Sequence, residues 1–180
     1  MAKYRKLGRT ASQRKALLRN QVTALLNNGK IVTTEAKAKE IRKQAESLIA
    51  LAVKEKDNFE EVTVMAKVAR KDKDGKRVKE VVDGKKKTVY DEVQKEITKD
   101  APSRLHARRQ MAKVFYSVKE VPAKGAGRKK NTKDIDMTKK MFEEIAPKYA
   151  GRNGGYTRIV KIGPRKGDAA MEVLLSLIHI

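Results

Sequence analysis

The sequence predicts an α+β fold, a two-layer arrangement of three to four helices on a small mixed sheet, with an inserted β-meander. Residues 12–28 and 34–56 carry apolar side chains at spacings of three and four, as a helix with one buried face requires. Residues 62–68 alternate apolar and other side chains, and two apolar runs at 156–162 and 171–178 close the chain. Helical and strand periodicities therefore occupy separate parts of the sequence.

These patterns divide the chain into three parts. Residues 1–10 form a basic N-terminal arm with almost nothing to bury, and such a segment is typically disordered alone. Residues 11–56 and 104–180 form the core of the fold. Residues 57–103 are an inserted β-rich segment, in which Asp74-Gly75 is one of two hairpin-turn signals.

The first helix is expected over residues 12–28. Its apolar stripe is Leu18, Val22, Leu25 and Leu26. Thr10 or Ser12 can cap the start, and Gly29 can supply the left-handed residue that ends a helix. The basic side chains that fall off the stripe are Arg14, Lys15 and Arg19. The helix is therefore expected to have one buried face and one basic face.

The second helix is expected to follow a short β-branched stretch, Lys30 to Thr33, which is interpreted as a strand or an extended link. Thr33 or Thr34 caps this helix, which runs to about Lys56. Its stripe is Ala38, Ile41, Ala45, Leu48, Ile49 and Ala52. The small residues of this stripe favour close packing against the first helix.

Two further helices and two strands are expected after residue 103. The apolar positions of the third helix region are Leu105, Ala112, Phe115 and Val118. A loop follows, and a fourth helix at about 137–146 turns Met137, Met141, Phe142 and Ile145 inward. The strands at 156–162 and 171–178 are joined by a turn that contains Arg165 and Lys166.

Charge is distributed unevenly along the chain. The formal net charge is +22, yet residues 1–34 hold eight Lys or Arg and no acid. Residues 104–166 carry eighteen basic residues against five acidic ones, whereas 57–103 is nearly neutral, with twelve against eleven. Such a charge repels itself in a compact chain unless an anion lies against it. Two basic clusters separated by a balanced segment indicate a polyanion, and nucleic acid is the obvious one.

Most other chemistries are excluded. The absence of Cys excludes disulfides and thiolate metal ligands and favours the cytosol. His106 and His179 are the only histidines, so neither a metal site nor a cofactor is expected. Residues 72–75 fit a hairpin turn better than a calcium loop, and 163–167 lacks the ending of a phosphate loop. No stretch reaches the about 18 apolar residues of a membrane span, and no active-site constellation is found.

Candidate nucleic-acid contacts come from three regions. The arm and the basic face of the first helix can follow one phosphate backbone, because an ordinary solvated helix face would include acids. A second ridge lies on the third helix, and a third region follows residue 153. The candidates are Lys3, Arg5, Lys6, Arg9, Arg14, Lys15, Arg19, Arg104, Arg108, Arg109, Tyr156, Arg158, Arg165 and Lys166.

Tyr156 has two interpretations. Gly154 and Gly155 allow close approach of a backbone, and the aromatic ring and Arg158 beside them suit a phosphate and an unpaired base. The same run fits a helix-to-strand turn with Tyr156 in the core equally well. The sequence leaves both interpretations open.

Five blocks of the sequence, in the same order, resemble a known family. They are GRTASQRKALLRN (8–20), TTEAKAKEIR (33–42), RLHARRQ (104–110), FEEIAPKYAGRNGGYTRI (142–159) and KIGPRKGDAAMEV (161–173). The family is the bacterial ribosomal large-subunit protein number seventeen (L-seventeen). The blocks cover most of the chain outside residues 57–103 and 119–136.

The resemblance implies a structural, non-enzymatic protein of the bacterial large ribosomal subunit that supports translation in the cytoplasm. Its implied partners are large-subunit ribosomal RNA, near the exit of the nascent-peptide tunnel, and neighbouring ribosomal proteins, with no membrane and no small-molecule substrate. Residues 57–103 are extra relative to the shortest members, and their charge balance predicts contact with solvent or a neighbouring protein. The basic 121–133 loop is expected to add RNA contacts, whereas Ser176 to Ile180 departs from the family's usual acidic-apolar end.

Two other classes compete with an RNA-binding protein. A DNA-binding architectural protein has the same charge, but the sequence has no helix-turn-helix spacing, zinc finger or basic zipper. A peripheral membrane protein requires a basic amphipathic helix with bulky apolar anchors, and the aliphatic residues of 12–28 suffice only for its own core. A comparison of the affinity for duplex DNA with the affinity for ribosomal RNA distinguishes the DNA-binding alternative from an RNA-binding protein.

Overall fold

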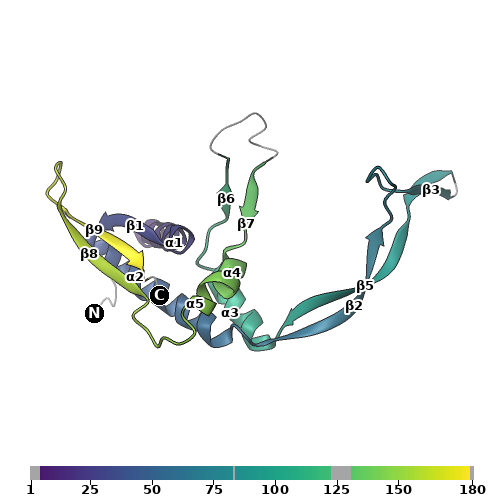
Figure 1. The fold of residues 1–180 in the computed structure, drawn as a ribbon. Coiled ribbons are helices and arrows are strands. Elements are labelled where there is room, and N and C mark those ends of the chain that lie inside the picture. The colour runs from purple at the N-terminus through teal and green to yellow at the C-terminus, as the bar shows by residue number, and fades with distance from the viewer. Residues whose placement is uncertain (1–4, 83, 123–130, 179–180) are drawn as a thin grey trace. The chain divides into compact units, whose positions relative to one another are not determined.

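The computed structural model describes residues 5–82, 84–122 and 131–178, which fall into two compact units (Figure 1). The first unit contains the described residues up to Asp57 and those from Pro102 onward, and the second is Asn58–Ala101. Helices, a three-stranded sheet and a short two-stranded hairpin make up the first unit, and paired strands make up the second. The predicted α+β class is confirmed.

Helix α2 (Glu35–Glu55) is the central element of the first unit, where it packs against α1 (Ala11–Asn28) and against the sheet. Its predicted stripe is confirmed, because all six side chains are buried. Three of the six are alanines, so their short side chains allow neighbouring elements to approach closely. Thr34 is the N-cap, as expected, with an extended backbone.

Helix α1 also buries the predicted residues, which are Leu18, Val22, Leu25 and Leu26. Thr10 occupies the N-cap position. Gly29 ends the helix with φ 77°, and its N–H donates to the Leu25 carbonyl at 2.8 Å. A side chain at Gly29 would be strained because this left-handed backbone favours glycine.

The sheet has the order β1-β9-β8, formed by β1 (Lys30–Thr34), β9 (Met171–Leu177) and β8 (Thr157–Pro164). It is antiparallel throughout rather than mixed, because β9 returns from the β8 hairpin and lies between two strands that both oppose it. The buried face of β9 presents Val173, Leu175 and Leu177 to the core.

Helix α3 (Pro102–Ala112) differs from the prediction in which face it buries. Leu105 and Ala112 are exposed, and the buried positions are Arg104, Ala107 and Met111. The Arg104 guanidinium lies over the Phe142 ring at 4.7 Å, so an arginine takes a position that periodicity gives to an apolar residue. Phe115, beyond the helix, is buried as predicted.

The predicted fourth helix is three consecutive segments, α4 (Met137–Lys140), the π-helical η1 (Met141–Ile145) and α5 (Ala146–Lys148). The Asp136 side chain caps it by accepting from the N–H groups of Thr138 and Lys139. The wider π turn precedes Pro147, which has no N–H to donate and crowds the carbonyl four residues earlier. The four side chains predicted to point inward are all buried.

A short hairpin stands where a loop was expected. Its strands are β6 (Val118–Glu120) and β7 (Lys133–Ile135), and Val118 lies opposite Ile135. The basic run Arg128 to Lys130, which was expected to add RNA contacts, lies outside the described residues.

The second unit is a long antiparallel ribbon of β2 (Phe59–Ala69) and β5 (Tyr90–Asp100), which pair along their whole length. A smaller pair, β3 (Lys79–Val82) and β4 (Lys85–Thr88), lies between them in sequence. One hairpin therefore lies inside another, whereas in the expected β-meander each strand would pair with the next one along the chain. Because β2 and β5 have equal length and pair along all of it, the β3–β4 hairpin lies at the tip of the ribbon.

Candidate nucleic-acid interface

The N-terminal arm is tied to α2 by an ion pair. Arg5 Nε lies 3.7 Å from Oε1 of Glu40, whose side chain is only 5% exposed. Lys43 lies 3.7 Å from the same oxygen, so the nearly buried carboxylate has two cationic neighbours. This contact anchors Arg5 to the core, while the Arg5 side chain remains 53% exposed.

The chain turns directly after Arg5. Leu7 and Gly8 have positive φ angles of 56° and 63°, and the Arg9 N–H donates to the Lys6 carbonyl at 3.2 Å. This turn leaves the Lys6 and Arg9 side chains exposed, in a stretch of the sequence that contains no acidic residue. Lys3, also a candidate, lies outside the described residues.

The arm and the β8–β9 hairpin meet at the N-terminus of α2, around a hollow of about 510 Å³. The cations that line this hollow are Arg5, Lys37, Lys39 and Arg165. Glu35 and Asp168 line it as well, and Glu35 accepts from Lys39 at 2.8 Å. Helix N–H groups and cations together favour an anion. Sequence reasoning missed Lys37 and Lys39 because only the fold brings them beside the arm.

Arg165 at the tip of the β8–β9 hairpin is engaged by Asp168. Arg165 Nε donates to Asp168 Oδ1 at 2.8 Å, and Glu172 lies 4.0 Å from the same guanidinium. The hydrogen bond from Arg165 lowers the pKa of Asp168 to about 2 and raises the pKa of Arg165 itself. Lys166, the next residue, is exposed. The tip therefore presents one paired and one exposed cation.

The three candidate cations of α1 have different environments. Lys15 is exposed and Arg14 is half-buried. Arg19 turns toward the segment that follows α3, where Nε donates to the Val114 carbonyl and Nη2 to the Phe115 carbonyl, each at 3.0 Å. Its guanidinium also lies 4.3 Å from the centre of the Tyr116 ring. Arg19 thus joins two parts of the core, a role that periodicity does not reveal.

The α3 ridge also separates into inner and outer members. Arg104 is buried over Phe142, and the Arg108 guanidinium lies 5.4 Å from the centre of the same ring. Arg108 also donates to the Thr138 hydroxyl at 3.2 Å. Arg109 is exposed. Of this ridge, Arg109 is placed best to meet a phosphate, and Arg104 is in the core.

Tyr156 lies in the core, at 4% exposure. Its hydroxyl donates to the Arg152 carbonyl at 3.0 Å, and its ring packs edge-on against Tyr149 with centres 5.3 Å apart. Of the two interpretations, the structure favours the turn with a buried tyrosine. Gly154 and Gly155, with φ 93° and 62°, form that turn.

The outward face of the sheet adds a cation that sequence reasoning missed. Lys30 of β1 and Arg158 of β8 both lie opposite Ser176 of β9, so the three side chains form one row on the same face. Lys30 and Arg158 are exposed. The row depends on strand register, which a single sequence does not specify.

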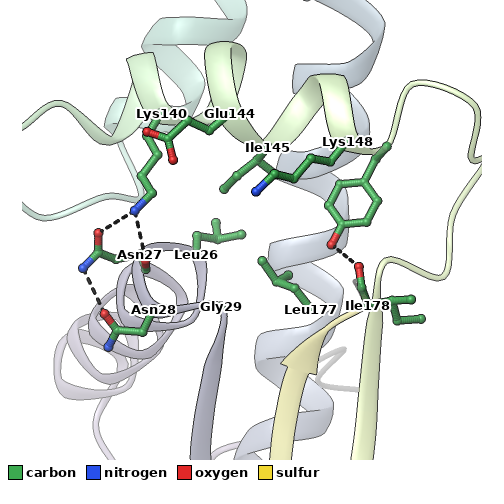
Figure 2. Close-up of a pocket in the computed structure, with 11 residues that line it drawn as sticks. Leu26, Asn27, Asn28, Gly29, Lys140, Glu144, Ile145, Lys148, Leu177 and Ile178 are labelled. Carbon is green, nitrogen blue, oxygen red and sulfur yellow. Dashed lines mark hydrogen bonds between the residues drawn. The ribbon is translucent and has the colours of Figure 1, made fainter. Parts of the chain in front are cut away.

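A smaller hollow of about 290 Å³ lies beside the end of α1 (Figure 2). Lys140 Nζ donates to the Asn27 carbonyl at 3.0 Å and to its side-chain oxygen at 3.2 Å. A cation there complements the negative end of the helix dipole. On the other side of the hollow, the Tyr149 hydroxyl donates to the Ile178 carbonyl at 2.7 Å. These contacts are structural, joining α1, the fourth helix and the end of β9.

Two features are absent from the described ranges, 5–82, 84–122 and 131–178. No cluster of three or more His, Asp or Glu side chains in them is arranged to hold a metal ion. Among the helices in these ranges, none combines the length and apolar character that a membrane span requires.

Known proteins resemble this chain along its whole length. The family described as ribosomal protein L17 matches residues 17–178. A large ribosomal subunit protein bL17 from Lachnospira eligens is 76% identical over 178 residues, covering 99% of this chain and 100% of that protein. The proteins of the same name from Acetivibrio thermocellus and Exiguobacterium sp. are 48% and 38% identical, covering 99% and 97% of this chain and 100% and 98% of their own lengths. The chain therefore belongs to the ribosomal protein L17 family and, as the sequence predicts, is a structural, non-enzymatic component of the large subunit of the cytoplasmic ribosome.

Proposed function

We propose that the basic surface of the first unit binds large-subunit ribosomal RNA near the exit of the peptide tunnel. The observation that carries this proposal is the acid-free stretch of residues 5–34, which puts exposed cations on the arm, on α1 and at the start of β1. Neutralising RNA phosphates with such side chains releases counterions and drives binding. The neighbourhood of the tunnel exit is supported by the family resemblance alone.

The side chains that we assign to RNA contact are the exposed or half-exposed cations. They are Arg5, Lys6, Arg9, Arg14, Lys15, Arg109, Arg158 and Lys166, with Lys30 added from the structure. Arg165 is proposed to join them when an RNA phosphate displaces Asp168 from its guanidinium. Arg108 is proposed to contact RNA from a half-buried position. Arg19, Arg104 and Tyr156 hold the surface in place from within, so we propose positioning roles for them.

The core, residues 11–56 and 104–180, is proposed to carry the RNA surface together with the 1–10 arm. Residues 57–103 are proposed to stay away from RNA, because their charge is balanced. A folded RNA junction, rather than a linear sequence, is the expected target, since proteins recognise structured RNA through shape and 2′-hydroxyls. Neighbouring ribosomal proteins complete the site.

Sedimentation and crosslinking together test this proposal. Tagged full-length protein is expected to co-migrate with the large subunit through a moderate salt wash. Ultraviolet crosslinks from purified subunits are expected to map to RNA segments around the tunnel exit. Crosslinks to RNA elsewhere in the subunit would contradict the proposed location. Equal affinity for duplex DNA and ribosomal RNA at matched salt would contradict RNA recognition.

A further inference from the structure

One aromatic ring lies at the surface of the first unit, in the segment just after α3. Tyr116 is 40% exposed, and no other aromatic residue among those described in this unit is exposed to that extent. The others are buried at 3–7% exposure, and they are Phe115, Phe142, Tyr149 and Tyr156. Aromatic rings contribute most when their large apolar area is buried. A tyrosine left at the surface is therefore available to a partner.

The ring is fixed in place by α1. The Arg19 guanidinium lies 4.3 Å from the ring centre and is itself held by the Val114 and Phe115 carbonyls. The Tyr116 N–H donates to the Thr23 hydroxyl at 3.2 Å, and that hydroxyl donates to the Arg19 carbonyl at 2.8 Å. Ring and guanidinium are thus positioned before a partner binds, which lowers the entropic cost of binding. Because Arg19 covers one face of the ring, a flat partner can stack only on the other face.

The two segments that meet at this ring both lack acidic residues. Residues 1–34 contain none, and neither do residues 101–119, which contain five Lys or Arg. Lys15 lies one helical turn before Arg19, on the same side of α1, and Lys113 lies three residues before Tyr116. Both lysines are exposed. A negatively charged group attached to a ring stacked on Tyr116 therefore finds a cation from each segment.

We infer that Tyr116 is the stacking site for one unpaired base of large-subunit ribosomal RNA, and that Lys15 or Lys113 binds the phosphate next to that base. A nucleotide matches both parts of the site, since its base is flat and its phosphate is negative. Proteins commonly hold unpaired bases on aromatic side chains in this way. A protein partner is disfavoured because it would need an excess of carboxylates to match the surrounding lysines. The inference rests on the proposed function, to which it adds a base contact among the phosphate contacts.

Filter binding of the full chain to large-subunit ribosomal RNA tests the inference. The Y116L variant keeps apolar bulk beside Arg19 but has no flat ring, so its affinity should fall about tenfold or more. Its salt slope should not change, because no charge is lost. The Y116F variant keeps the ring and should bind like the unmodified chain. The matched control is Y90L, which removes a tyrosine that is 56% exposed in the second unit and should leave the affinity unchanged.

A fluorescence measurement reports the stacking itself. The chain has no tryptophan, so Y116W supplies a single indole at the site. Stacking on a base quenches indole emission. We expect saturating large-subunit ribosomal RNA to quench the Y116W variant strongly. A fully paired RNA duplex should bind through its phosphates and leave the emission nearly unchanged, because its bases are already stacked on each other.

Three results would overturn the inference. They are equal RNA affinities of Y116L and the unmodified chain, a loss of affinity in Y116L together with a shallower salt slope, and unquenched emission from RNA-bound Y116W. The fluorescence result decides the question if Y116L does not fold. Unchanged RNA affinity of Y116L, combined with its loss from large subunits in cells, would assign the ring to a ribosomal protein instead.

The same measurements separate this inference from the proposed function. An unmodified chain that does not bind ribosomal RNA overturns both proposals. An unmodified chain that binds ribosomal RNA no better than Y116L does overturns the stacking site alone.

Discussion

The Arg5 guanidinium of the arm lies 3.7 Å from the carboxylate of Glu40, a side chain nearly buried on α2. This contact fixes the start of the acid-free stretch against the folded core. It also brings the arm beside the β8–β9 hairpin, at the hollow that Arg5 and Arg165 share. One nearly buried acid therefore holds one end of the basic surface, through a contact that no local sequence pattern predicts.

Removing the Glu40 charge should loosen the arm. We expect E40Q to lower the free energy of unfolding by about 1 kcal/mol, because a half-exposed ion pair contributes little. Amide hydrogens of residues 6–9 should exchange faster while those of α1 stay protected. Unchanged exchange in the arm, measured by mass spectrometry, would show that Glu40 does not anchor it.

Arg19 and Arg14 form a matched pair of substitutions on one helix. R19A removes two hydrogen bonds to main-chain carbonyls and the contact of the guanidinium with the Tyr116 ring. It should therefore lower the free energy of unfolding by about 2 kcal/mol. R14A should change stability by less than about 0.5 kcal/mol and weaken RNA binding instead. Denaturant unfolding and filter binding of both variants test whether Arg19 serves stability and Arg14 serves RNA binding. An R19A protein as stable as the unmodified chain would refute this assignment.

Lys15 and Arg158 are predicted to neutralise one phosphate each. Either K15A or R158A should reduce the slope of log affinity against log salt by roughly 0.7–0.9. Both side chains are exposed, so unfolding should be unaffected. Filter binding to large-subunit ribosomal RNA over a range of salt concentrations measures the slope. A slope equal to that of the unmodified chain would remove the residue from the interface.

Asp168 limits the charge that Arg165 offers to RNA. The folded pKa of Asp168 is about 2, below its ordinary 3.8, so the pair is complete at neutral pH and is lost only as pH falls toward 2. NMR titration should therefore give a midpoint near 2 that moves up in R165A. At pH 7, D168N should free Arg165 and steepen the salt slope by about one phosphate's share. Weaker RNA binding by D168N would contradict this competition.

Most elements of the first unit were predictable because their apolar periodicities are strong. The stripes of α1 and α2 agree residue by residue with the buried side chains. The failure at α3 has a physical cause: Arg104 is buried by stacking on Phe142, and periodicity treats arginine as a surface residue. Strand order and register were not predictable, because they depend on which distant segments meet.

The candidate interface was predictable in its charge and only partly in its members. An acid-free stretch identifies a basic surface, yet Arg19 and Arg14 look alike in sequence and differ in their contacts. Lys30 was not predicted as a contact, because its alignment with Arg158 arises from the β1-β9-β8 register. Tyr156 was undecided because a glycine-rich turn and a base-stacking site use the same residue types.

The most direct test of the central claim compares the full chain with one that lacks residues 58–101. The ends of the ribbon are adjacent, since the Ala101 N–H donates to the Asn58 carbonyl at 3.2 Å, so Asp57 can be joined to Pro102. We predict the same affinity for large-subunit ribosomal RNA and the same salt slope for both chains. A large loss of affinity, or a slope shallower by several phosphates, would show that the ribbon, and not the first unit alone, binds the RNA.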